Sequence, residues 1–164
     1  MLKDFTVSVT DAAELTGGTR PSKLVIENAK FKAKAIAADS ETVVIAADTV
    51  VYYKGEYFLK PKSIDGAFKM LKKLSGNVHY VYTGVCVRRG DSEICFYDKS
   101  AVKMKKLTDA EIADYIKTDS PLDKAGAYGI QDNVAVASYT GSYTNIIGLP
   151  LEKLSEALKA FGIG

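Results

Sequence analysis

Apolar side chains recur at helical spacing in four segments of the chain. The clearest stripe, on residues 22–37, has a lysine among its members and consists of Val25, Ala29, Lys32, Ala33 and Ile36. Thr108 and Glu111 have the spacing of a capping box, in which each side chain satisfies a free backbone donor of the other residue. We therefore expect helices over residues 22–37, 67–74, 108–116 and 150–161.

Runs rich in β-branched and aromatic residues lie between these segments. They cover residues 5–9, 42–53, 57–60, 78–89, 92–105 and 134–139. Some runs are continuously apolar and others alternate, which indicates a mixed, twisted sheet with flanking helices in an α/β or α+β fold. No linker, repeat or low-complexity tract interrupts the pattern, so we expect one domain over residues 1–164.

One hairpin can be placed in register from its turn. A two-residue turn at Gly90-Asp91 pairs Arg89 with Ser92, and it therefore sets Cys86 opposite Cys95. The same register predicts an ion pair between Arg88 and Glu93. The two cysteines are either packed thiols or a redox-sensitive pair, and the lack of an export signal favours reduced thiols.

Composition narrows the functional class without naming it. Lys and Arg number 22 against 20 Asp and Glu, a balance that argues against a nucleic-acid-binding protein. No apolar run reaches the ~20 residues of a membrane span, and the first residues lack a signal peptide, so we expect a cytoplasmic protein with no membrane partner. One histidine and two hairpin cysteines match no zinc-site spacing. We expect that histidine, His79, to be a satisfied residue of the sheet.

Asp48 is the most informative residue because it interrupts an apolar strand, residues 43–51. An ionised carboxylate there is costly unless a cation, a metal or hydrogen-bond donors compensate it. Asp48 is either a structural residue that holds a neighbouring loop, or a general base or magnesium ligand. Thr49 adds a hydroxyl on the opposite face of the same strand.

Lysines supply the other half of a candidate site. Lys32 lies within an apolar helical stripe, where it either extends its charge to solvent or forms part of the candidate site. Lys60 ends a short strand just before Pro61, and Lys124 precedes two glycines in the segment that ends at Gln131. Carboxylates and lysines together suit an anionic phosphate substrate with a hard divalent ion.

Several segments, taken in order, resemble the Maf family of nucleoside triphosphate pyrophosphatases. They are Ala29-Lys30-Phe31-Lys32-Ala33, Ala47-Asp48-Thr49-Val50-Val51, Lys60-Pro61, residues 74–84, Asp123 to Gln131, Gly141-Ser142 and Gly148-Leu149-Pro150-Leu151. Each motif alone is weak, but their shared order over nearly the whole chain is specific. The resemblance implies a two-lobed fold similar to that of inosine triphosphatases, with the site in the cleft.

The resemblance also implies hydrolysis of a nucleoside triphosphate to a monophosphate and pyrophosphate with Mg²⁺ or Mn²⁺. Asp48 would be the base or a metal ligand, and Glu14 matches the family's acidic residue loosely as a second ligand. Lys32, Lys60 and Lys124 would neutralise the phosphates, while Thr49 and Gln131 would help to choose the base. The motif variants resemble the branch that acts on dTTP, UTP or modified pyrimidine nucleotides.

The resemblance is incomplete at the amino end. The family begins with a strand and an S-x-S-P-R-R loop that this chain lacks, so we expect it to be short by about twenty residues. The chain also differs from the family's motifs at three single positions, Leu59, Asn77 and Asp132. An alternative is therefore a weakly active or inactive member that binds nucleotides or a partner protein. The resemblance suggests a cellular role in nucleotide clean-up or in septum formation. The protein is either a monomer or a homodimer.

Overall fold

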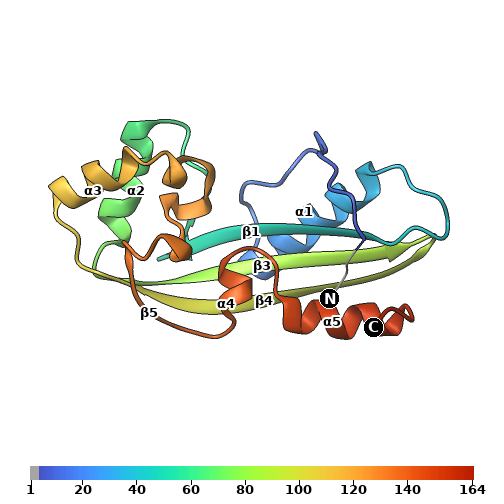
Figure 1. Cartoon of the computed structure of the whole chain (residues 1–164). Coiled ribbons are helices and arrows are strands. Elements are labelled where there is room, and N and C mark those ends of the chain that lie inside the picture. Colours follow the sequence, from blue (N-terminus) through green and yellow to red (C-terminus); the bar gives the residue numbers. More distant parts are fainter. Residues whose placement is uncertain (1–3) are drawn as a thin grey trace.

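The computed structural model describes residues 4–164 (Figure 1). The main helices are α1 (Pro21–Ala35), α2 (Ile64–Leu74), α3 (Asp109–Ile116), α4 (Tyr143–Ile146) and α5 (Leu151–Ala160). The strands are β1 (Val44–Tyr53), β2 (Glu56–Phe58), β3 (Val78–Arg89), β4 (Ser92–Met104) and β5 (Val136–Thr140). Three short 3₁₀ turns lie between α3 and β5: η1 (Ser120–Asp123), η2 (Ala125–Ala127) and η3 (Ile130–Asp132).

The five strands form one sheet in the order β2-β1-β3-β4-β5. This arrangement of helices around a sheet confirms the α/β class. The pairings between the described strands are all antiparallel, so the expectation of mixed strand directions was wrong. The apolar run of β1 reflects packing on both faces of an antiparallel strand.

The predicted strand over residues 5–9 is also wrong for the part of the chain that the structure describes. Phe5, Val7 and Val9 do alternate with polar residues, but their side chains are 73%, 79% and 93% exposed. A strand needs a neighbour that accepts its backbone hydrogen bonds, and the described sheet places none beside this segment.

Helices cover both faces of the sheet. Along β3, Cys86 faces α1, where it packs with Ala29 and Ala33, whereas the neighbouring Val85 and Val87 pack against α5 on the other face. Val81 joins the core formed with α2 and α3. Figure 1 shows α2 and α3 near one end of the long strands and α1 and α5 near the other. Among the described residues, no helix is long and apolar enough to cross a membrane.

Candidate active site

A cleft of about 440 Å³ opens beside β1, between the N-terminal half of the chain and the loop of residues 123–131. It brings together the residues that the sequence singled out, although they come from five separate segments. These residues are Glu14, Lys32, Asp48, Thr49, Lys60, Lys124 and Gln131. Beyond Phe58, β2 no longer pairs with β1, so the edge of β1 near Asp48 borders this cleft.

The centre of the cleft is a cluster of two acids around one lysine. Lys32 Nζ lies 3.0 Å from Asp48 Oδ1 and 3.0 Å from Glu14 Oε1. The same ammonium donates to the backbone oxygen of Ala47 at 3.2 Å. Lys32 therefore pairs with buried acid rather than extending to solvent, and Asp48 is only 9% exposed.

Asn28 holds this cluster in place, although no sequence motif pointed to it. Its Nδ2 donates to Asp48 Oδ2 at 2.9 Å. The same amide also exchanges two hydrogen bonds with the backbone of Leu15, the neighbour of Glu14. Asn28 lies one helical turn before Lys32 and is 1% exposed. A polar residue at that spacing from Lys32 was the signal available in the sequence.

The electrostatics of the cluster favour a charged lysine. Burial alone lowers the pKa of Lys32, but the negative charges and hydrogen bonds of Asp48 and Glu14 more than offset it. The pKa is therefore raised above the usual lysine value, and Lys32 stays a cation at neutral pH. One lysine against two carboxylates leaves the cluster with a net negative charge, which attracts a further cation.

Three more lysines line the opposite side of the cleft. Lys60 and Lys62 line it with exposed side chains just after β2. Lys124 is more constrained, because its Nζ donates to the backbone oxygen and the hydroxyl of Ser120 at 2.9 and 3.0 Å. It also pairs with Asp123 Oδ1 at 3.1 Å. The site thus combines a fixed ammonium at Lys124 with freer ones at Lys60 and Lys62.

The loop that carries Lys124 and Gln131 is tightly packed under the cleft. Gly126 has a φ of 73°, and a Cβ there would lie 3.0 Å from Val51 Cγ2, so the position requires glycine. Tyr128 OH lies 2.7 Å from His79 Nε2, which connects the loop to β3. His79 Nδ1 is buried with no hydrogen-bond partner, so the expectation of a satisfied histidine holds for one ring nitrogen only.

Thr49 lines the cleft on the side of β1 opposite to Asp48. Its Oγ1 lies 2.9 Å from Thr83 Oγ1, the cross-strand neighbour on β3. Thr83 in turn donates to the backbone oxygen of Asn145 at 3.0 Å. Gly148 lies next to Thr49 on this side of the cleft, where a Cβ on the glycine would be 3.5 Å from Thr49 Oγ1.

The donor set of the central cluster fits a hard divalent ion. Carboxylate oxygens are the ligands that Mg²⁺ prefers, and each carboxylate retains acceptor capacity beyond its contact with Lys32. Mg²⁺ is usually held by one or two carboxylates together with substrate phosphates, a number that Asp48 and Glu14 match.

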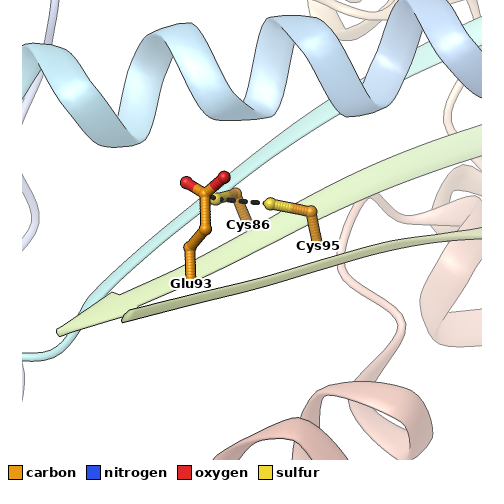
Figure 2. A group of neighbouring side chains, drawn as sticks. All are labelled: Cys86, Glu93 and Cys95. Atoms are coloured by element: carbon orange, nitrogen blue, oxygen red, sulfur yellow. Dashed lines mark hydrogen bonds between the residues drawn. The ribbon is translucent and has the colours of Figure 1, made fainter. Parts of the chain in front are cut away.

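A second group of potential metal ligands lies on the β3–β4 hairpin, outside the cleft. Figure 2 shows Cys86, Glu93 and Cys95 beneath α1, with the two sulfur atoms 2.8 Å apart. This placement confirms the predicted pairing of the cysteines, and both are free thiols. Burial raises the pKa of both thiols, so they are protonated at neutral pH, which favours packed thiols over metal ligation.

The predicted ion pair between Arg88 and Glu93 does not form. Arg88 instead donates to the backbone oxygens of Ala33 and Ile36, where its charge meets the unpaired carbonyls at the end of α1. Glu93 pairs with Lys30 at 3.7 Å. The predicted register of the hairpin was right, but the carbonyl oxygens at the end of α1 bind the guanidinium of Arg88 in place of Glu93.

Comparison with known proteins identifies the family. The family model described as Maf-like protein matches residues 1–161. A dTTP/UTP pyrophosphatase of Lachnoclostridium phytofermentans is 44% identical over 98% of this chain and 86% of its own length. A protein of the same name from Thermosipho melanesiensis is 46% identical over 85% of this chain and 77% of its own length. Another, from Bacillus cereus, is 39% identical over 97% of this chain and 85% of its own length. The motifs, the fold and these relatives agree, and the chain belongs to the Maf family.

Proposed function

We propose that this protein hydrolyses dTTP, UTP or related pyrimidine nucleoside triphosphates to the monophosphate and pyrophosphate. The observation that carries the proposal is the buried carboxylate of Asp48, held by Lys32 and Asn28 in a cleft that three further lysines line. The names of the relatives specify the substrates. Those names also favour an enzyme over a protein that only binds nucleotides or a partner.

The cleft contains the groups that phosphoryl transfer requires. A water attacks the α-phosphorus, the bond to the bridging oxygen breaks, and pyrophosphate leaves. Asp48 orients this water and accepts its proton, while Lys32 holds the carboxylate in position. Lys60 and Lys124 neutralise the charge that develops on the phosphates, and Thr49 and Gln131 contact the base.

Asp48 and Glu14 would hold a Mg²⁺ or Mn²⁺ ion together with the phosphates. Such an ion, when bound, withdraws electron density from the phosphoryl oxygens and screens their charge. Lys32 lies between the two carboxylates, and its positive charge offsets the repulsion between them. We infer that the protein acts in the cytoplasm, where it removes nucleoside triphosphates from the nucleotide pool. We also infer that a single domain spans the chain and carries this activity.

The substitution Asp48→Asn tests the assignment. It keeps the size of the side chain but removes the base and a metal ligand, so pyrophosphate release from UTP or dTTP should fall by about 10³-fold or more. Asp91→Asn, an exposed turn residue of the β3–β4 hairpin, is the matched control and should retain full activity. Equal turnover by the wild type and Asp48→Asn would contradict the proposal, provided that thermal melting shows both variants folded.

A further inference from the structure

One carboxylate oxygen of Asp132, just beyond the loop under the cleft, accepts two hydrogen bonds. Tyr115 OH lies 2.6 Å and Ser120 Oγ lies 2.9 Å from Asp132 Oδ2. A carboxylate accepts hydrogen bonds and donates none, so each hydroxyl gives its single proton to Asp132. Burial and the hydrogen bond to Asp132 raise the pKa of Tyr115, so the phenol keeps that proton at neutral pH. Both hydroxyl groups are therefore acceptors towards their other neighbours.

Those other neighbours are two donors in the wall of the cleft. Ser120 Oγ lies 3.0 Å from Lys124 Nζ, and Tyr115 OH accepts the backbone N–H of Gly129 at 2.8 Å. An ammonium and a backbone amide can only donate, so both contacts have the direction that Asp132 imposes. One oxygen atom thus aligns two chains of hydrogen bonds, which end at the Lys124 side chain and at the Gly129 backbone. Both of these residues line the cleft.

The contacts of Lys124 indicate what this alignment does for a phosphate. An ammonium has three donors, and Lys124 uses them on the backbone oxygen of Ser120, the hydroxyl of Ser120 and Asp123 Oδ1. The Asp123 side chain is 78% exposed, and ion pairs at such positions contribute little free energy. A phosphate oxygen can therefore replace Asp123. The two hydrogen bonds to Ser120 remain, and they fix the direction of the third donor.

We propose that Asp132 is a positioning residue that aims the Lys124 ammonium at the triphosphate. It acts through Ser120, and through Tyr115 it also holds the Gly129 backbone beside the lysine. A Cβ at Gly129 would lie 3.0 Å from both Asp132 Oδ2 and Lys124 Cε, so the two side chains pack closely against the glycine. The inference rests on the proposed function, which it deepens by assigning how a phosphate-binding lysine is held.

The test is a double-mutant cycle on kcat/KM for the hydrolysis of UTP. Asp132→Ala removes the shared acceptor, so kcat/KM should fall by about tenfold. In a Lys124→Met background the same substitution should change kcat/KM by less than about twofold, because the group that Asp132 positions is gone. Asp114→Ala, the same change at an exposed position of α3, is the matched control and should leave kcat/KM unchanged.

Two further variants test the chain of hydrogen bonds itself. Asp132→Asn keeps an oxygen that can accept both hydroxyl protons, so it should retain most of the activity. Ser120→Ala removes only the hydroxyl between Asp132 and Lys124, and it should lower kcat/KM about as much as Asp132→Ala does. Ser120→Ala therefore tests the proposal even if Asp132→Ala fails to fold.

Native-state hydrogen exchange gives a readout that does not depend on activity. The Gly129 amide, which donates to Tyr115 OH in the wild type, should exchange about tenfold faster in Asp132→Ala. The amides of β3 and β4 should keep their protection, because their ladder lies outside this network.

The outcomes separate positioning from general damage. Wild-type kcat/KM in Asp132→Ala would overturn the proposal, and so would a tenfold loss that persists in the Lys124→Met background. An equal loss in Asp132→Asn would contradict a role that needs only an acceptor oxygen. If the wild type hydrolyses no nucleotide, the proposed function fails, but calorimetric binding of α,β-methylene-UTP still measures the coupling between Asp132 and Lys124.

Discussion

His79 is a buried base whose neutral form the fold requires. Burial lowers its pKa from 6.5 to about 4, and its ring contacts Tyr128, which supports the loop of Lys124. The pKa is lower in the folded state, so the unfolded chain takes up the proton first as the pH falls. The contribution of neutral His79 to the free energy of unfolding is therefore fully present above about pH 6.5 and is lost as the pH falls towards 4.

We expect the protonation of His79 alone to lower the free energy of unfolding by about 3 kcal/mol between pH 6.5 and pH 4. Urea denaturation of the wild type and His79→Gln over that pH range measures it, because the glutamine cannot titrate. The difference in stability between the two proteins should shrink as the pH falls. Parallel pH profiles would show that His79 does not carry the effect.

The key residues differed in how well the sequence revealed them. Asp48 was predictable because a charge inside an apolar strand conflicts with its surroundings. Asn28 was not recognised, because an asparagine on a helix has many harmless explanations until the Leu15 backbone and Asp48 are seen beside it. The hydrogen bond from Thr83 to the backbone oxygen of Asn145 joins residues 62 positions apart, which no local pattern contains.

At the scale of elements, the position of α1 depends on Gly84. A Cβ at that position would lie 2.3 Å from the backbone carbonyl of Val25, so the helix could not keep its present contact with β3. We expect Gly84→Ala to lower the unfolding free energy by about 3 kcal/mol, measured by urea titration. The control Gly17→Ala, whose Cβ would meet only Tyr57 Cδ2 at 3.9 Å, should stay close to the wild type. Equal midpoints for the two variants would refute a close approach at Gly84.

Elements with local rules were predicted well. The capping box of Thr108 and Glu111 forms, and the two-residue turn fixed the register of β3 and β4 correctly. The predicted strand over residues 5–9 failed because strand formation depends on a neighbour that the sequence pattern does not specify. The expectation of a sheet with mixed strand directions failed for the same reason, since the burial pattern of a strand does not reveal which strands lie beside it.

For the whole molecule, balanced net charge conceals a concentration of charged groups at the cleft. Four lysines line it together with three acids, Glu14, Asp48 and Asp123, and the lysines beyond the central cluster are the groups available to a triphosphate. Exposed ammonium groups such as Lys60 are screened by salt within a Debye length of about 10 Å. We expect the KM for a triphosphate to rise about fivefold between roughly 0.05 and 0.3 M KCl, with a smaller change in kcat.

Initial-rate measurements at several salt concentrations test this expectation. Lys60→Met should reduce the salt dependence, and Lys153→Met, which lies outside the cleft and pairs with Asp98, should preserve it. A KM that does not respond to salt would mean that the lysines contribute little to substrate binding.

The long β3–β4 hairpin has a kinetic consequence. Its 12- and 13-residue strands are joined by a two-residue turn, so they pair early at a small loss of chain entropy. The cleft needs β1, α1 and the loop of residues 123–131, which dock from distant parts of the sequence. A transition state that contains the hairpin but not the cleft has no affinity for nucleotide. We expect a bound nucleotide to slow unfolding in stopped-flow experiments and to leave the folding rate unchanged, so ligand occupancy would set the lifetime of the folded protein.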